Sequence, residues 1–297
     1  TYQAGKLVVR DAPKYWDDPD NLVANQYEMF DGRNTFSESD WQRLIVKCQK
    51  EGITFMSSAW DEENVDMLDA LGMSAFKIGS ADITSLPLIS YTARKGKPII
   101  LSTGASNMGE IEAAVEVIRA EGNEDIILLH CILSYPADYK DANLKMMAWL
   151  QQVIPDIPVG LSDHTKSTIA PIGAVALGAR IIEKHFILNK KLKTQDAAFS
   201  ITPENFTDMV KKIRDLEKTF GNSKIEVTKS MRSSRKLLRS LYFVKKVKKN
   251  EKITRQNVRS IRPSGGLEPK YLKKILGKKA AKNINFGTPV SLKLIKN

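Results

Sequence analysis

Between Gly52 and Phe220 the chain alternates short apolar runs with longer amphipathic segments. The short runs have the length and residue types of buried strands, and the longer segments have the periodicity of helices. Six strand and helix units follow one another, with strands predicted at residues 53–60, 75–82, 98–104, 125–133, 158–163 and 179–186. Because strands that alternate with helices form parallel sheets with right-handed crossovers, the pattern predicts an α/β fold, either a barrel or a doubly wound sheet.

The segments on either side of this repeat have a different character. Residues 11–36 are rich in turn residues and predict an elaborated loop, and Ser37–Glu51 opens with SESD and predicts an N-capped amphipathic helix. After Phe220 a Ser-, Lys- and Arg-rich stretch is followed by short strands broken by turns. We therefore predict three parts: a large domain over residues 1–222, a linker over 223–240 and a small β-rich domain over 241–297.

The composition favours a protein of a reducing compartment. With 42% hydrophobic residues the chain can build a large core, yet no apolar run approaches the roughly 18 residues that cross a bilayer. The only two cysteines, Cys48 and Cys131, lie in apolar surroundings, which argues against a disulfide framework. We expect a cytoplasmic protein that does not bind membranes.

The net charge of +12 is unevenly distributed along the chain. Residues 209–297 hold 26 Lys and Arg against 5 Asp and Glu, whereas residues 1–208 hold 20 against 29. A basic C-terminal third can indicate nucleic acid, or an anionic substrate and an acidic partner surface. The run KKVKKNEK lacks interleaved aromatic residues and matches no nucleic-acid-binding motif, so we expect a solvated basic face and no nucleic-acid partner.

Polar and ionisable side chains gather where the predicted strands end. In a parallel barrel these ends form one rim, and enzymes of that architecture place their active sites there. No GxGxxG or Walker pattern follows any of the strands, which disfavours a dinucleotide-binding, doubly wound sheet. The rim candidates are Ser57, Ser58, Lys77, Ser80, Ser102, Thr103, His130, Tyr135, Ser162, Asp163, His164, Glu183, Lys184 and His185.

His164 and His185 end two successive strands and suggest a metal site. Two neutral imidazoles suit a divalent ion such as Mn²⁺ or Zn²⁺, with carboxylate, water or substrate oxygens completing the coordination. Glu183 lies on the same side of its strand as His185, so we include it with the histidines as a candidate catalytic residue. The alternative is that both histidines are structural, one capping a turn and one lying on the rim; we expect that of His130, which lies within an apolar strand.

A second group of rim residues offers one cation and several hydroxyls. A phosphate or carboxylate needs a positive charge and several hydrogen-bond donors, and these are provided together by Lys77, Ser80, Ser102, Thr103 and Ser162. Each of these residues alone could simply form an ordinary hydrogen bond at a strand end. Jointly they favour an anionic ligand. Strand alternation points Lys184 away from these side chains, so we expect it to form a salt bridge within the barrel.

The order of the strand-end motifs resembles a known family. KIGSAD, ILSTG, LLHC with SYPADYKDANL, GLSDHT, IIEKHF and a downstream Asp196 before SITPENF are similar to the motifs of the N-acetylneuraminate (sialic acid) synthase family, which includes pseudaminic and legionaminic acid synthases. SLYFVKKVKKNEKITRQNVRSIRPSGGLEP resembles the antifreeze-like (SAF) domain of that family. The similarity runs from Thr1 to the end of the chain.

The resemblance implies a TIM-type (β/α)₈ barrel followed by a small, β-rich antifreeze-like domain. It implies condensation of phosphoenolpyruvate with an N-acetylated aldose, either N-acetylmannosamine or a diacetamido-trideoxyhexose, to give a nonulosonic acid and phosphate. The divalent metal held by His164 and His185 would be Mn²⁺, with Mg²⁺ or Co²⁺ as alternatives. The positions that match substrate contacts are Lys77, Ser80, Ser102 and Ser162 for phosphoenolpyruvate, and Tyr135, Asp82 and Asp196 for the sugar.

Arg262, in SIRPSGG, matches an arginine that reaches the N-acetyl group in the partner's barrel. The resemblance therefore implies a domain-swapped homodimer, and a basic small domain over an acidic barrel suits that arrangement. From this residue alone, the simpler interpretation is that Arg262 supports its turn.

Three departures from the family pattern limit these expectations. The resemblance implies that the chain begins after the first strand, first helix and second strand of the family's barrel. Leu133 stands where many relatives have a polar residue, and Asp82 stands where a glutamate is common. The alternatives are another phosphoenolpyruvate aldol-type sugar-acid synthase and a non-catalytic, decayed carbohydrate-binding relative.

Overall fold

The computed structural model describes residues 2, 4–14, 25–31, 36–192, 194 and 196–297, and the chain divides into two compact units, residues 1–221 and 222–297. The loop predicted over residues 11–36 lies partly outside the described residues. Its described part contains α2 (Gln26–Phe30), which follows the short helix α1 (Ala4–Leu7).

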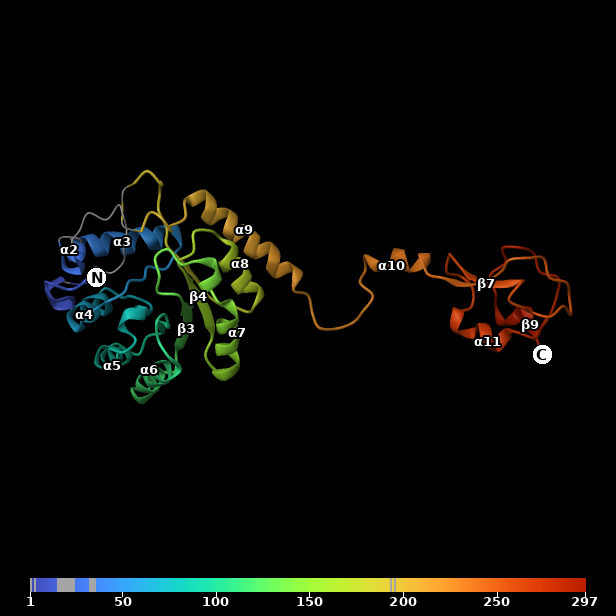
Figure 1. Cartoon of the computed structure of the whole chain (residues 1–297), viewed down its shortest axis with the longest axis horizontal. Coiled ribbons are helices and arrows are strands. Elements are labelled where there is room, and N and C mark those ends of the chain that lie inside the picture. The colour runs from blue at the N-terminus through green and yellow to red at the C-terminus, as the bar shows by residue number, and fades with distance from the viewer. Residues whose placement is uncertain (1, 3, 15–24, 32–35, 193, 195) are drawn as a thin grey trace. The chain divides into compact units, whose positions relative to one another are not determined.

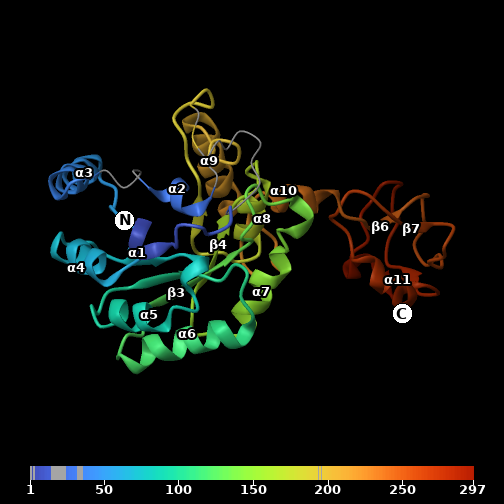
Figure 2. The same ribbon diagram turned by 60° about the vertical axis from the view of Figure 1, so that its left-hand side comes forward.

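Unit 1 is built on a five-stranded parallel sheet whose order in space, β1-β2-β3-β4-β5, is also its order in the chain. A doubly wound sheet reverses its strand order at a switch point, and this sheet does not. The sheet instead curls as part of a barrel, which confirms the predicted barrel class (Figure 2). The strands are β1 (Phe76–Ile78), β2 (Ile99–Ser102), β3 (Ile126–Cys131), β4 (Val159–Asp163) and β5 (Ile182–Lys184).

Helices cover the outer side of this sheet (Figures 1 and 2). They are α4 (Glu62–Ala70), α5 (Leu86–Ala93), α6 (Met108–Ala120), α7 (Leu144–Val153), α8 (Ile169–Ala176) and α9 (Pro203–Thr219), with the short 3₁₀ helices η1 (Ser80–Asp82) and η2 (Tyr139–Asp141) in the loops. Ile99, Leu101 and Leu128 from the strands pack with Ile89 and Ile118 from the helices, and none of the five is exposed. Burying each such side chain stabilises the fold by about 1.5–3 kcal/mol, so this layer fixes the position of the strand ends.

The predicted helix at the start of the repeat is confirmed as α3 (Glu38–Glu51). The Ser37 hydroxyl accepts from the Asp40 N–H, and the Asp40 carboxylate accepts from the Ser37 N–H. This reciprocal capping satisfies two donors that the first turn of a helix leaves open. The SESD signal therefore marked the helix start correctly.

The strand predicted at residues 53–60 is wrong. Only Ser58 pairs with the sheet, through a single parallel bridge to Lys77 of β1. Ile53 is 61% exposed, so the apolar residues of this segment are not all turned into the core. Apart from this bridge, the segment forms no ladder with β1 in the described part of the chain, so it stays irregular.

Unit 2 is a small module with its own core. It holds α10 (Met231–Ser234), β6 (Ser240–Phe243), β7 (Val258–Ile261), α11 (Leu272–Ile275), β8 (Lys279–Ala280) and β9 (Ile295–Lys296), together with the 3₁₀ helices η3 (Arg235–Leu237), η4 (Pro269–Tyr271) and η5 (Leu292–Leu294). Leu241, Phe243 and Val258 are buried between the antiparallel pair β6 and β7 and the surrounding turns. Across the described residues of both units, every helix is too short or too polar to cross a membrane.

Candidate active site

Lys77, Ser162 and Glu183 meet at the carboxyl ends of β1, β4 and β5. Because Ser162 and Glu183 are partners in the β4–β5 register, the Ser162 hydroxyl donates to Glu183 Oε1 over 2.6 Å. Lys77 Nζ lies 3.5 Å from Glu183 Oε2. The side chains of Ser162 and Lys77 are largely buried, so a carboxylate already meets a hydroxyl and a cation in a sheltered place.

Ser80, Gly104 and Cys131 extend this cluster along the rim. The Gly104 N–H donates to Ser80 Oγ over 3.0 Å. A Cβ atom at Gly104 would lie 2.8 Å from that oxygen and 3.2 Å from Cys131 Sγ, so only glycine allows this close approach. Burial raises the pKa of the Cys131 thiol, against hydrogen bonds with Ser80 and Ser162 that lower it, and the thiol remains neutral near pH 7.

The two hydroxyls at the end of β2 differ sharply. Ser102 is 2% exposed, and its Oγ has no hydrogen-bond partner among the described residues. A buried polar atom without a partner is uncommon and calls for a ligand or water. Thr103 Oγ1 instead donates to the Leu129 carbonyl over 3.2 Å, within the sheet. Ser102 is therefore available to a ligand, and the hydroxyl of Thr103 is engaged.

His164 and His185 lie side by side, with ring centroids 5.1 Å apart. His164 Nδ1 donates to the Ile132 carbonyl over 2.9 Å, and His185 Nδ1 lies 3.3 Å from Asp196 Oδ2. Each contact leaves Nε2 as the nitrogen that can bind a ligand. Burial lowers the pKa of His164, more than its hydrogen bond to the Ile132 carbonyl raises it, so this ring stays neutral near pH 7.

Two aromatic rings enclose the histidine pair. The Tyr135 ring lies 4.3 Å from that of His164, and the Phe199 ring lies 4.8 Å from that of His185. The donor set fits a divalent ion held through two neutral imidazole nitrogens. No group of three or more His, Cys, Asp and Glu side chains is placed to hold a metal in the described parts of the chain.

The residues that precede the two histidines in the sequence form a buried ion pair. Lys184 Nζ is 2.7 Å from Asp163 Oδ2, and the two side chains are 1% and 2% exposed. The ammonium also donates to the Thr165 carbonyl, and the Thr165 N–H and hydroxyl donate to the Asp163 carboxylate. This confirms the salt bridge predicted for Lys184. Sequence reasoning did not identify its partner, although Asp163 and Lys184 each precede a histidine.

His130 lies apart from the pair. It is 5% exposed, and its Nε2 lies 2.9 Å from the Ala142 carbonyl. Burial lowers the pKa of His130, so its imidazole is a neutral donor to that carbonyl. The structure agrees with the structural role expected for it.

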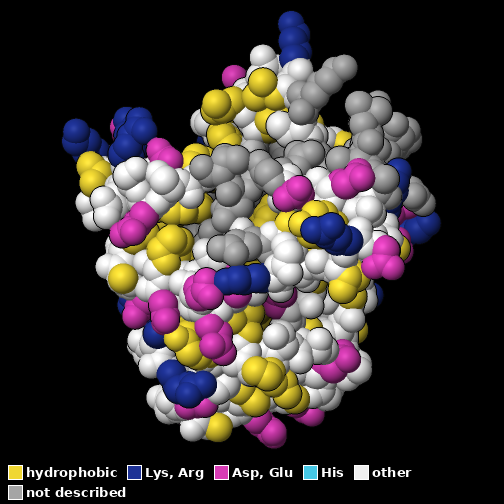
Figure 3. All heavy atoms as spheres, turned by 90° about the vertical axis from the view of Figure 1, so that its left-hand side faces the viewer, with side chains coloured by type: hydrophobic (Ala, Val, Ile, Leu, Met, Phe, Trp, Pro, Cys, Tyr) yellow, Lys and Arg dark blue, Asp and Glu magenta, His cyan; other side chains and the backbone are white. Residues whose placement is uncertain are grey.

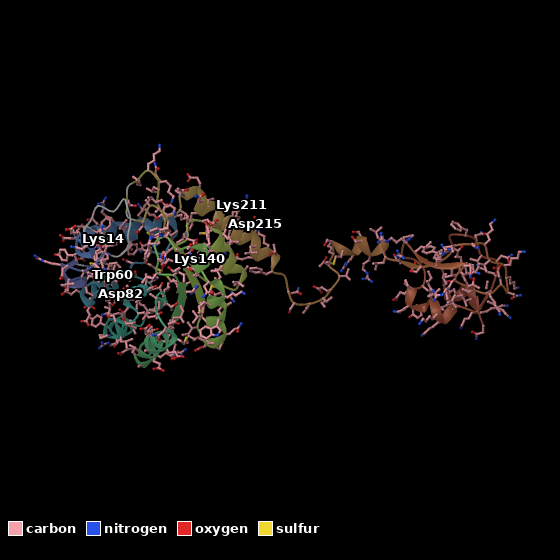
Figure 4. All side chains as sticks on the ribbon, viewed as in Figure 1. Lys14, Trp60, Asp82, Lys140, Lys211 and Asp215 are labelled. Carbon is pink, nitrogen blue, oxygen red and sulfur yellow. The ribbon has the colours of Figure 1, made fainter. Side chains whose placement is uncertain are left out.

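A cavity of about 480 Å³ opens beside His185. Burial raises the pKa of the Asp82 carboxyl, which lines this cavity, to about 6, although Lys77 acts to lower it. Trp60 and Asp82, both labelled in Figure 4, line this cavity. The full lining consists of Tyr2, Leu7, Val8, Gln26, Met29, Phe30, Trp60, Ala81, Asp82, Tyr135, His185 and Asp196.

Sequence reasoning missed Trp60 and Gly104 as site residues. The available signals were a tryptophan directly before the N-cap Asp61 of α4, and a glycine directly after the Ser-Thr pair at the end of β2.

Acidic and basic side chains are interspersed on the face of unit 1 seen in Figure 3, and no large basic patch is seen on that face.

Arg262 belongs to unit 2, where it is exposed directly after β7. The loop that follows is held by Ser240, whose Oγ donates to the Pro263 carbonyl and accepts from the Gly266 N–H. A Cβ at Gly266 would collide with the Leu241 carbonyl, so this loop requires glycine there. The loop is thus fixed in shape with the arginine at its start.

Comparison with known proteins gives consistent matches over the whole chain. Residues 1–225 match the model of the NeuB family and residues 239–296 that of the SAF domain. The chain is 38% identical over 262 residues to a pseudaminic acid synthase of Campylobacter jejuni, covering 88% of this chain and 76% of that protein. It is 34% identical over 295 residues to the N,N'-diacetyllegionaminic acid synthase of Legionella pneumophila, covering 97% and 82%.

A solved structure has the same architecture. The spore coat polysaccharide biosynthesis protein SpsE of Bacillus subtilis is 29% identical, with a TM-score of 0.62 over 100% of this chain and 85% of that one.

Proposed function

The chain belongs to the NeuB family, and from this premise we propose that it condenses phosphoenolpyruvate with an N-acetylated aldose to give a nonulosonic acid and phosphate. C3 of phosphoenolpyruvate forms a bond with the aldehyde carbon of the open-chain sugar, water adds at C2, and phosphate leaves. One water is consumed for each phosphate released.

The observation that carries this proposal is the pairing of two different subsites on one rim. Lys77, Ser162 and Glu183 meet on one part of it, and His164 and His185 lie 5.1 Å apart on another. Lys77, Ser80, Ser102 and Ser162 would hold the anionic groups of phosphoenolpyruvate. The unpartnered Ser102 hydroxyl supports this assignment, and the Gly104 N–H holds Ser80 Oγ in place. Thr103 lies beside Ser102 in this site, but its hydroxyl already donates to the Leu129 carbonyl and is not available to the ligand.

Glu183 already contacts Ser162 and Lys77, so an arriving phosphate or carboxylate competes with it for both donors. The competition turns the Glu183 carboxylate from those donors toward the reacting atoms. There it can accept a proton from the water that adds at C2, which is the catalytic role we assign to it.

The sugar would bind in the cavity beside His185. Tyr135, Asp82 and Asp196 all line this cavity and offer one hydroxyl and two carboxyl groups to sugar hydroxyls. The Nε2 atoms of His164 and His185 would hold the divalent ion, Mn²⁺ or else Mg²⁺ or Co²⁺. When bound, such an ion supplies Lewis acidity at the aldehyde oxygen. Asp196 keeps the His185 ring oriented, and Phe199 shields it from water.

We further propose that the protein acts in the cytoplasm as a domain-swapped homodimer that binds neither nucleic acid nor membrane. The free cysteines Cys48 and Cys131 support a reducing compartment. The basic C-terminal third and the acidic remainder support docking of the small domain over another subunit's barrel, with Arg262 near the N-acetyl group.

Phosphate release tests this function. The purified full-length protein would be incubated with Mn²⁺, phosphoenolpyruvate and a panel of N-acetylmannosamine, 2,4-diacetamido-trideoxyhexoses and phosphorylated aldoses. We expect release only with an acetamido sugar, lost in His164→Ala and His185→Ala and retained in His130→Gln. Release with a phosphorylated aldose alone would favour another aldol-type synthase, and no release with any sugar would favour a non-catalytic relative.

A further inference from the structure

The indole N–H of Trp60 is buried and unpartnered in a wall of the sugar cavity. Trp60 Nε1 has no hydrogen-bond partner among the residues that the structure describes, and Trp60 lines the 480 Å³ cavity beside His185. A buried donor without an acceptor destabilises a folded protein, so native structures keep very few of them. The indole is a donor only, and what is missing is therefore an acceptor atom.

Trp60 is held rigidly by its neighbours. Its ring stacks on that of Tyr2 at 4.7 Å and meets the edge of Phe30 at 5.7 Å, while Tyr2 and Phe30 contact each other at 5.1 Å. The next residue, Asp61, caps α4 by accepting from the Asn64 N–H. The three rings come from separate segments of the chain, so the fold itself brings them together as a preorganised aromatic cluster.

Several of the remaining side chains that line the cavity are apolar, and Gln26 adds one amide group to them. Leu7, Val8 and Met29 line it together with Phe30 and Ala81. Sugar hydroxyls placed against such a wall would lose water without gaining partners, which is unfavourable. A group with one carbonyl acceptor and a methyl fits both the wall and the orphan donor.

We propose that this aromatic cluster is a subsite for a second acylamino group of the sugar. Trp60 Nε1 donates to the carbonyl oxygen of that group, and its methyl packs against Tyr2, Phe30 and Met29. The subsite selects a diacetamido-trideoxyhexose over N-acetylmannosamine, whose hydroxyls would face the wall. Asp82 and Asp196, which line the same cavity, remain for hydroxyls. This inference rests on the proposed function and narrows its substrate class.

Trp60→Phe tests the subsite because it removes the indole N–H donor and keeps an aromatic ring in the wall. We expect the KM for a diacetamido sugar to rise about ten-fold, as for one lost hydrogen bond, with the KM for phosphoenolpyruvate unchanged. The KM for N-acetylmannosamine should not change. Trp149→Phe is the matched control, since Trp149 is 44% exposed on α7 and does not line the cavity. Equal KM values for wild type and Trp60→Phe would overturn the proposal.

A second measurement does not depend on turnover. The chain has four tryptophans, and the indole ¹H–¹⁵N signal of Trp60 is identified by its loss in Trp60→Phe. We expect it to shift when a diacetamido sugar is added and to stay in place when phosphoenolpyruvate is added. A shift in a protein that releases no phosphate with any sugar would support the subsite and contradict the reaction. An unmoved signal at saturating sugar in an active enzyme would contradict the subsite alone.

Discussion

At the scale of single residues, hydrogen bonds on the Nδ1 atoms of His164 and His185 decide what these rings can bind. A backbone carbonyl takes one Nδ1 and the Asp196 carboxylate takes the other, so both rings present Nε2. The same contacts fix the ring orientations, which no pairing of histidines in the sequence can specify. A metal site of two imidazoles thus depends on two acceptors outside the histidines themselves.

Lys77 carries the only positive charge among the residues assigned to phosphoenolpyruvate. Lys77→Met removes that charge from a largely buried place, so we expect the KM for phosphoenolpyruvate to rise roughly 10- to 100-fold. Steady-state kinetics with varied phosphoenolpyruvate measure this. Lys97→Met is the control, because Lys97 pairs with Asp69 outside the rim. If the KM for phosphoenolpyruvate changes equally in both variants, Lys77 is not part of the anion site.

Asp82 should give the sugar KM a pH dependence. Its pKa is raised to about 6 from 3.8, so below about pH 6 the carboxyl is protonated and loses an acceptor for a sugar hydroxyl. We expect the sugar KM to rise as the pH falls through 6, and Asp82→Asn to abolish that dependence. A pH profile of the sugar KM that is the same in Asp82→Asn would contradict the assignment.

The same shift has a consequence for stability. Since the folded pKa lies above the unfolded one, the folded state holds the proton more tightly, and stability falls as the pH rises from about 4 to about 6.

Residue types at strand ends were predictable from the sequence, but their partners were not. From the sequence, the adjacent hydroxyls of Ser102 and Thr103 are equally good candidates for binding an anion. In the structure the Ser102 hydroxyl has no partner among the described residues, whereas the Thr103 hydroxyl donates to the Leu129 carbonyl. The place of Trp60 directly before the N-cap Asp61 is a weak sequence signal, because the residue's significance arises from its contacts with Tyr2 and Phe30. Such distinctions depend on which way a side chain turns at the end of a strand.

At the scale of elements, the Asp163–Lys184 pair ties β4 to β5 just before the two histidines. The pair is fully shielded, and removing one partner leaves a buried charge without compensation. We expect Lys184→Met to lower the free energy of unfolding by about 3–5 kcal/mol in denaturant titrations. Asp163→Asn combined with Lys184→Met should recover part of this loss.

An exposed pair provides the control for that measurement. Lys47 and Glu51 lie one turn apart on α3 with both side chains more than half exposed. Lys47→Met should change the free energy of unfolding by at most about 1 kcal/mol. A Lys184→Met loss no larger than that of Lys47→Met would mean that the buried pair does not hold the two strands together.

Elements with strong local signals were predicted well, and elements that depend on distant neighbours were not. The Ser37 capping box predicted α3 to within a residue, because cap and helix are contiguous in the sequence. The run at residues 53–60 has the composition of a strand but forms only the Ser58–Lys77 bridge. A strand forms only where a neighbouring strand pairs with it along its length. Whether such a neighbour exists cannot be read from the residues of the segment itself.

At the scale of the whole molecule, the opposite charges of the two parts of the chain suit a small domain that serves another subunit's barrel. Coexpression of differently tagged His164→Ala and Arg262→Ala subunits tests this. If Arg262 acts in the partner's site, each mixed dimer has one intact site, and random assembly restores about a quarter of the sites. If Arg262 acts within its own subunit, mixing restores nothing beyond the activity of the separate variants.

In the proposed reaction this protein joins the carbons of phosphoenolpyruvate to a sugar. Mass spectrometry of the products from ¹³C₃-labelled phosphoenolpyruvate and the preferred acetamido sugar tests it directly. We predict a sugar acid that carries all three labelled carbons, formed in equal amount with phosphate and absent in His185→Ala. Release of phosphate without labelled carbon in the sugar would contradict the proposed reaction.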